Sequence, residues 1–166
     1  MSKSKLTGKG AVPATDAGAS LMMANVRATL RALSRTSDDL EDTVSRLNAF
    51  VCDDAQGRRF VTMFLCQLSP ESDAVQYVGA GHAAFRQSAD GETEMLDATG
   101  VPLGVSKESP PGCSEISSFP NGGVLLLPTD GLNEASDADG ELFGLERIKQ
   151  ILSSGRGRRA ESLVKE

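Results

Sequence analysis

The chain has 166 residues and a mass of 17.4 kDa, which suits one domain with a substantial core rather than two. Its residues are 39% hydrophobic and 24% charged, an ordinary globular composition that argues against a disordered or low-complexity chain. The net charge of -6 and the pI near 4.9 disfavour nucleic acid and anionic membranes as partners, because both would be repelled.

The cysteines and the ends of the chain indicate the compartment. Cys52, Cys66 and Cys113 are odd in number and lack CxxC or CxxH spacing, so they indicate reduced thiols rather than disulfides or a zinc site. No apolar segment follows the basic start, and no window is long and apolar enough for a membrane span. We therefore expect a soluble, cytoplasmic protein.

Two helices are predicted in the first third of the chain. The apolar residues of segment 18–34 recur every three or four positions and form one stripe: Met22, Val26, Leu30 and Leu33. A second stripe follows: Leu40, Val44, Leu47 and Val51. Thr36 and Ser37 are predicted to cap this second helix, with acids in its first turn. The short connection predicts an antiparallel pair of helices.

The middle of the chain reads as antiparallel strands. Segment 60–68 is apolar throughout and predicts a central strand covered on both faces, followed by a turn at 69–73 and a strand at 74–80. Asp90-Gly91 predicts a hairpin between 84–88 and 92–96. Asn121-Gly122-Gly123 predicts another between 113–119 and 124–127. A last helix is predicted at 143–152, with Leu145, Ile148 and Leu152 at helical spacing. This order of elements predicts a layered α+β domain.

The predicted domain spans residues 18–152. It lies between an irregular segment at 1–17 and a polar, basic tail at 153–166. Short charge runs at a terminus are usually solvated, so we assign no site to the tail.

The strongest candidate for chemistry is the run from Gly123 to Gly131. Its apolar residues predict a buried strand that ends at Thr129-Asp130-Gly131, a position from which metal ligands commonly project. One carboxylate alone is usually a ligand or a helix cap. Whether Asp130 belongs to a metal site therefore depends on whether other acidic residues lie near it.

Three weaker motifs have simpler interpretations. His82 is the only histidine, and at a strand end it is more often a turn residue than a ligand or general base. Asp137-Ala-Asp139-Gly140 with Glu146 partly reproduces an EF-hand calcium loop, but Ala135 stands at the first ligand position, so we favour a polar turn. Lys9 lies between glycines without phosphate-loop spacing.

Six strings occur in an order and with gaps that are typical of a known family. They are GASLMMANVRATLRAL, FVTMFLCQLSPES, YVGAGH, LDATGVPLGV, LLLPTDGLNEA and DGELFGLERI. In these strings the chain resembles the PPM-type bacterial serine/threonine phosphatases of the sporulation stage II protein E family, over about residues 18–151. That family includes phosphatases that regulate stress-response sigma factors. The resemblance implies an α-β-β-α sandwich in which two antiparallel sheets are flanked by helices.

The resemblance also implies a binuclear magnesium or manganese centre. In the family, aspartates hold two cations, and the bridging water, as hydroxide, attacks phosphorus while the metals neutralise phosphoryl charge. Asp130 matches a metal-ligand aspartate of the family, and Gly131 would let the backbone approach the site closely.

The chain departs from the family at both ends, so we expect the sandwich to be incomplete there. The family's Asp-Val-Ser-Gly-His/Lys-Gly string has one candidate remnant in Gly8-Lys9-Gly10, with Lys5 at the place of the aspartate. Aligning Gly18 directly places Ala11 there instead. The family's final Asp-Asp-x-Thr strand has no counterpart before Glu166. Because one acid cannot organise two hydrated divalent cations, we expect little or no turnover and no stable binding of two ions by this chain.

Two functions follow from the resemblance and the departures. The first is metal-dependent dephosphorylation of phosphoserine or phosphothreonine on a regulatory protein, of the anti-sigma-factor antagonist type, by a catalytic domain of which this is part. The second is a non-catalytic module that binds a phosphorylated signalling protein. In both cases exposed sheet edges favour a homodimer or aggregation over a stable monomer.

Overall fold

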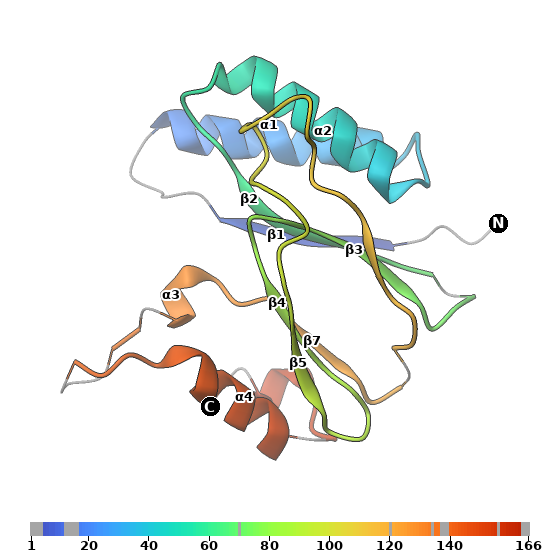
Figure 1. Ribbon diagram of the computed structural model, residues 1–166, viewed down its shortest axis with the longest axis vertical. Coiled ribbons are helices and arrows are strands. Elements are labelled where there is room, and N and C mark those ends of the chain that lie inside the picture. Colours follow the sequence, from blue (N-terminus) through green and yellow to red (C-terminus); the bar gives the residue numbers. More distant parts are fainter. Residues whose placement is uncertain are drawn as a thin grey trace. The chain divides into compact units, whose positions relative to one another are not determined.

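The structure, a computed structural model, describes residues 5–11, 17–69, 71–119, 121–133, 135–136, 140–155 and 157–163. The chain forms two compact units, where the sequence predicts a single domain (Figure 1). The first unit comprises Met1–His82 and Asp97–Ser118, and the second comprises Ala83–Leu96 and Phe119–Glu166.

The first unit contains a four-stranded antiparallel sheet with strand order β1-β2-β3-β6. Its strands are β1 (Lys5–Ala11), β2 (Thr62–Leu68), β3 (Val75–Ala80) and β6 (Ser114–Ile116). In β2, successive residues from Met63 to Cys66 are all buried, so both faces of this strand are covered. The predicted central strand is therefore confirmed, as is the short turn that leads into antiparallel β3.

The two predicted helices lie side by side and antiparallel on one face of this sheet (Figure 1). They are α1 (Ala17–Leu33) and α2 (Leu40–Ala55). Both contribute buried residues to one apolar cluster with β2 and β3, and its members include Met22, Val26, Val44, Leu47, Leu65 and Val78. The predicted stripes thus form the core of the first unit.

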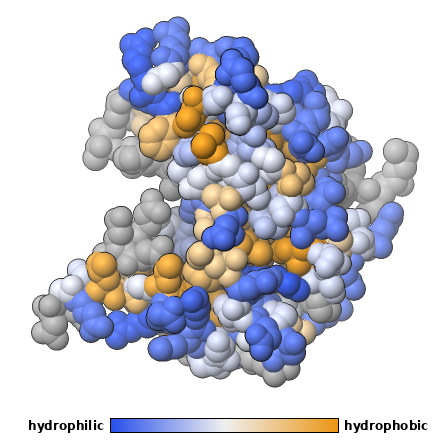
Figure 2. Space-filling model, viewed as in Figure 1, coloured by the Kyte–Doolittle hydropathy of each residue, from blue (hydrophilic) through white to orange (hydrophobic). Residues whose placement is uncertain are grey.

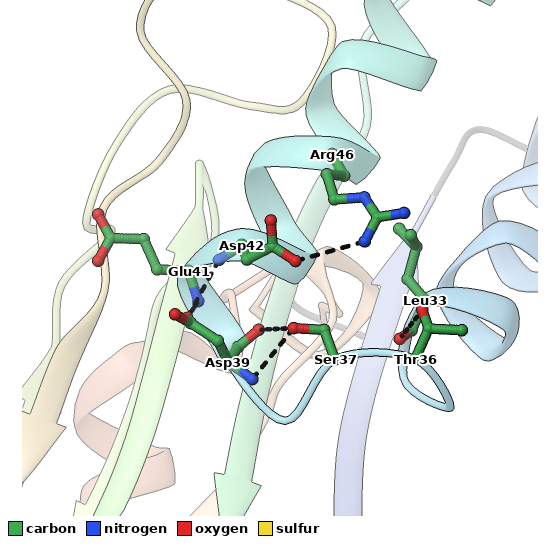
Figure 3. A network of polar contacts seen from close by, with 7 residues as sticks. All are labelled: Leu33, Thr36, Ser37, Asp39, Glu41, Asp42 and Arg46. Carbon is green, nitrogen blue, oxygen red and sulfur yellow. Dashed lines mark hydrogen bonds and ion pairs between the residues drawn. The ribbon is translucent and has the colours of Figure 1, made fainter.

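The cap of α2 differs from the prediction. Asp39, rather than Thr36 or Ser37, is the N-cap, and its Oδ1 accepts from the backbone N–H groups of Glu41 at 2.8 Å and Asp42 at 3.1 Å (Figure 3). The Thr36 hydroxyl donates back to the carbonyl of Leu33 at 3.0 Å, at the end of α1. The helix begins two residues later than a Ser37 cap would allow, and its first residue, Leu40, lies in the core.

The second unit contains a three-stranded antiparallel sheet with strand order β5-β4-β7. Its strands are β4 (Ala84–Gln87), β5 (Thr93–Leu96) and β7 (Val124–Leu126), and its helices are α3 (Asp130–Asn133), α4 (Gly144–Ser154) and α5 (Ala160–Leu163). The predicted hairpin at Asp90-Gly91 is confirmed. Phe85 of β4 packs with Ile148 and Leu152 of α4, whereas Leu145 is exposed and takes no part in this core.

Two predicted local structures are wrong. Segment 113–119 does not form a hairpin with 124–127, because β6 pairs with β3 and β7 pairs with β4 in the other sheet. The segment 1–17 is not irregular throughout, since Lys5–Ala11 forms β1 along the edge of β2. Both errors have one cause: a turn signal or a weak strand pattern does not reveal which distant strand offers an open edge. The predicted α+β class with two antiparallel sheets is confirmed.

Candidate functional site

The strand β7 leads into the Thr129-Asp130-Gly131 corner, as predicted. Leu126 pairs with Phe85 in the sheet, and residues 127–129 then connect the strand to α3, whose first residue is Asp130. The carbonyl of Thr129 accepts from the backbone N–H of Leu132 at 2.8 Å, which closes the first turn of this short helix. The backbone of Asp130 therefore lies just past the end of a sheet strand.

The roles of Asp130 and Gly131 stay predictions. The side chain of Asp130 lies outside what the structure describes. Among the described residues, a side chain added at Gly131 would meet only the Thr129 hydroxyl, at 4.0 Å, so these neighbours give no steric reason for glycine.

The described residues do not fit a binuclear metal centre. Across these ranges of the chain, no group of three or more histidine, cysteine, aspartate or glutamate residues could hold a metal ion. Hard cations such as magnesium need several oxygen donors around one point, so we derive no catalytic step through a metal. Asp137 and Asp139 of the EF-hand-like run lie outside the described residues, and Glu146 forms an ion pair with Lys149 at 2.8 Å.

The candidate remnant Gly8-Lys9-Gly10 and one of the family strings lie at the same end of the sheet in the first unit, with β2 between them. Gly10 of β1 pairs with Met63 of β2, which in turn pairs with Ala80 of β3. The Gly8-Lys9-Gly10 string and the Ala80-Gly81-His82 string therefore end near each other, although 70 positions separate Gly10 from Ala80. Lys5 is the first residue of β1, opposite Leu68, so the backbone of this segment belongs to a paired strand rather than to a phosphate-binding loop.

His82 lies in a tight turn after β3. Gly81 has a φ of +60°, and a Cβ there would come within 2.6 Å of the Pro102 ring. A Cβ at Gly79 would lie 2.6 Å from the carbonyl oxygen of His82, so the chain folds back closely on itself. These contacts support the interpretation of the string as a turn, and a chemical role for half-buried His82 stays untested.

Thr99 holds this turn together and was not identified from the sequence. Its Oγ1 accepts from the N–H of Gly79 at 3.0 Å and donates to the carbonyl of Gly112 at 2.7 Å. Its own N–H donates to the carbonyl of Gly79 at 2.8 Å. In the sequence, only the position of Thr99 within the family string LDATGVPLGV could have indicated its importance.

Asn48 is a second residue that sequence reasoning missed. It lies on the buried side of α2 and is 1% exposed. Its amide bonds to the segment that follows Leu103, accepting from the N–H of Gly104 and donating to the carbonyl of Ser106. A polar residue next to the apolar stripe, between Leu47 and Val51, was the available signal.

Two of the described thiols, Cys66 and Cys113, have raised pKa values. The structure contains free Cys52, Cys66 and Cys113, in agreement with the prediction of reduced cysteines. Burial raises the pKa of Cys66, and burial followed by the nearby charge of Glu41 raises the pKa of Cys113. Neither group therefore offers a thiolate nucleophile near neutral pH.

Comparison with known proteins identifies the family of this chain. The sequence profile described as "Stage II sporulation protein E (SpoIIE)" matches residues 12–166. Comparison with curated protein sequences gave no match. None of the helices within the described ranges is both long and apolar enough to cross a membrane.

Solved structures share the fold at low sequence identity. The SiaA-PP2C domain of Pseudomonas aeruginosa superposes with a TM-score of 0.83 and 16% identity, over 99% of this chain and 67% of that one. The PP2C phosphatase domain of SpoIIE from Bacillus subtilis, with a fragment of its regulatory domain, gives 0.75 and 13%, over 96% and 48%. RsbX in complex with magnesium gives 0.71 and 18%, over 98% and 72%. The chain thus has the fold of PP2C-type domains and spans between about half and three quarters of these three chains.

Proposed function

Because the chain belongs to the Stage II sporulation protein E (SpoIIE) family, we propose that it is part of a metal-dependent phosphatase domain. Its substrate would be phosphoserine or phosphothreonine on a regulatory protein of the anti-sigma-factor antagonist type, in the cytoplasm. The family match over residues 12–166 carries this proposal. The position of Asp130, separated from the end of β7 by three residues and at the start of α3, supports its assignment as a magnesium or manganese ligand, with Gly131 beside it.

We further propose that this chain turns over little substrate. Lys5 begins β1, and one alignment with the family puts it where an aspartate would bind metal. A lysine there would repel a cation rather than hold it.

Hydrolysis of p-nitrophenyl phosphate with manganese tests both parts. We expect weak activity that Asp130→Ala abolishes, while Asp54→Ala, an exposed acid on α2, serves as the matched control and has no effect. Lys5→Asp should raise the manganese-dependent rate, and Lys9→Asp, the same change within β1, should not. Equal rates for Lys5→Asp and Lys9→Asp would contradict the role assigned to position 5. Ala11→Asp tests the other alignment in the same assay.

The second candidate is a binding module without turnover. The scattered donor set favours it, because recognition of a phosphorylated protein does not require two metal ions. A phosphoserine peptide should bind this module equally well with and without EDTA, and better than the unphosphorylated peptide. Loss of binding in EDTA would favour the enzyme instead.

We also propose that the chain dimerises through a sheet edge, and β7 is the best candidate. Residues 124–126 contain no charged side chain, whereas β5 contains Glu94 and β6 contains Glu115. Charged residues on edge strands oppose pairing with another chain. Sedimentation should show a dimer that Leu125→Lys dissociates, and a monomer at all concentrations would exclude this proposal.

A further inference from the structure

A row of three arginines begins on the exposed side of α1 and ends in the turn just beyond it. Arg27, Arg31 and Arg35 follow one another at intervals of four residues, and all three are exposed. The N–H of Ser34 still donates to the carbonyl of Leu30, so the helical path continues toward Arg35 just beyond the end of α1. At 1.5 Å per residue the row extends over roughly 12 Å along the helix.

The stability of α1 does not explain this row. The helix contains no acidic residue, and like charges four residues apart destabilise a helix. The helix dipole favours Arg31 in the last turn, but Arg27 lies one turn further from that end. Within the described ranges, none of the three arginines forms an ion pair with a carboxylate.

Two cations on other described helices do pair with carboxylates. Arg46 on α2 pairs with Asp42 at 3.4 Å, and Lys149 on α4 pairs with Glu146 at 2.8 Å. The arginine row is therefore a local concentration of uncompensated positive charge on a chain whose net charge is -6.

Small or apolar side chains lie beside the arginine row. Ala24 and Ala28 are exposed next to it, and Leu21, one turn nearer the start of α1, is 64% exposed. Small side chains let a second helix approach closely. Figure 2 shows mainly hydrophilic residues over the part of the surface where Figure 1 places α1 and α2, with apolar residues as separate spots.

We propose that this outer face of α1 docks an acidic α-helix of a partner protein, whose carboxylates recur once per turn and lie along Arg27, Arg31 and Arg35. A partner of opposite charge complements the row over two helical turns. The net charge of -6 opposes a long polyanion such as nucleic acid more strongly than it opposes a short acidic helix, which carries fewer charges. A membrane surface is disfavoured because the apolar stripe of α1, which includes Met22 and Val26, is already buried. The proposal does not depend on the phosphatase assignment.

A fluorescent helical peptide with one glutamate per turn, measured by anisotropy against the full chain, tests the proposal. We expect binding at low ionic strength that weakens in high salt. Arg27→Glu and Arg31→Glu should each weaken it about tenfold, because charge reversal places like charges together. Arg58→Glu is the matched control, since Arg58 is exposed outside α1 and its guanidinium donates to the neutral amide of Gln56. It should leave the affinity within twofold of the wild type.

Other outcomes would overturn the proposal. They are equal losses for Arg58→Glu and Arg31→Glu, equal binding of a peptide with glutamine in place of glutamate, or no binding at low salt. Tighter binding of single-stranded DNA or of phosphatidylserine vesicles than of the peptide would also exclude a protein helix as the ligand. Arg27→Gln, which keeps a good helix former, should reproduce the loss with an unchanged circular dichroism spectrum.

Discussion

The buried side chain of Asn48 and the backbone of Gly104 are joined by a hydrogen bond, although 56 residues separate them. The Gly104 N–H donates to Asn48 Oδ1 at 3.0 Å, and Asn48 Nδ2 donates to the carbonyl of Ser106 at 2.8 Å. One amide on α2 therefore holds two points of the segment that follows Leu103. The antiparallel bridge between Leu103 and Val61, with two backbone bonds of 2.9 Å, attaches the same segment to the start of β2.

Asn48→Leu should lower the free energy of unfolding by about 2–3 kcal/mol. The leucine fills a similar volume but leaves the Gly104 N–H buried without its acceptor, and an unsatisfied buried group costs about 1–3 kcal/mol. Urea unfolding followed by circular dichroism measures the change. Gln76→Leu, the same exchange at an exposed position of β3, should change stability by less than about 0.5 kcal/mol. Equal effects of the two substitutions would contradict the role of Asn48.

Gly104→Ala should destabilise the protein, whereas Gly112→Ala should not. Gly104 has a φ of +89°, and a Cβ there would lie 2.8 Å from Val51 Cγ1 and 3.2 Å from the carbonyl oxygen of Arg59. We expect a loss of about 1–3 kcal/mol from the unfavourable backbone conformation and the crowding. Gly112 has open space around it and no positive φ, so alanine there should be neutral or slightly stabilising. Thermal unfolding of the pair would show the difference as a lower Tm for Gly104→Ala alone.

Asp39→Ala should cost about 1 kcal/mol, because it removes the acceptor for two N–H groups at the start of α2. Asp38→Ala, one residue earlier, removes the same charge but not the cap, and should cost less than half as much. Asp39→Asn should retain most of the stability, since an amide oxygen also caps a helix. If Asp38→Ala and Asp39→Ala were equally destabilising in urea, charge rather than capping would be the cause.

The Cys66 thiol should make stability fall at high pH. Burial raises its pKa above the ordinary value of 9.0, so the folded state holds the proton more tightly than the unfolded state does. This contribution is fully present below about pH 9, and it is lost as the pH rises through the folded-state pKa. Urea unfolding at about pH 8 and at about pH 10 gives the free energy of unfolding at both values. This free energy should decrease less between them for Cys66→Ala than for the wild type.

Elements with strong local patterns could be predicted from the sequence. The stripes that contain Met22 and Val44 specify the two helices, because an apolar row every three to four residues has only one way to be buried. The apolar run of β2 and the Asp90-Gly91 turn were equally informative. The cap at Asp39 was misplaced by two residues, since several adjacent side chains could accept the same bonds.

Strand partners and the polar contacts of the loops could not be predicted in this way. Nothing local in Lys5–Ala11 indicates a strand, and its pairing depends on the edge that β2 offers. The hydrogen bonds of Asn48 and Thr99 join segments that lie far apart in the sequence. A pattern in a single sequence can single out these residues but cannot identify their bonding partners. Of the candidate site, the sequence predicted only that Asp130 follows the end of a strand.

By itself the sequence determined α1, α2 and α4, the central strand, the α+β class and the family, because periodic burial and ordered motifs depend on residues that are close together in the sequence. Tertiary structure alone decided which strands share a sheet, and that Gly8-Lys9-Gly10 and Ala80-Gly81-His82 lie at the same end of one sheet. It also decided that the arginines of α1 face solvent without carboxylate partners among the described residues. The physical reason is that hydrogen-bond partners and uncompensated charge depend on which distant segments meet, and only the folded chain brings those segments together.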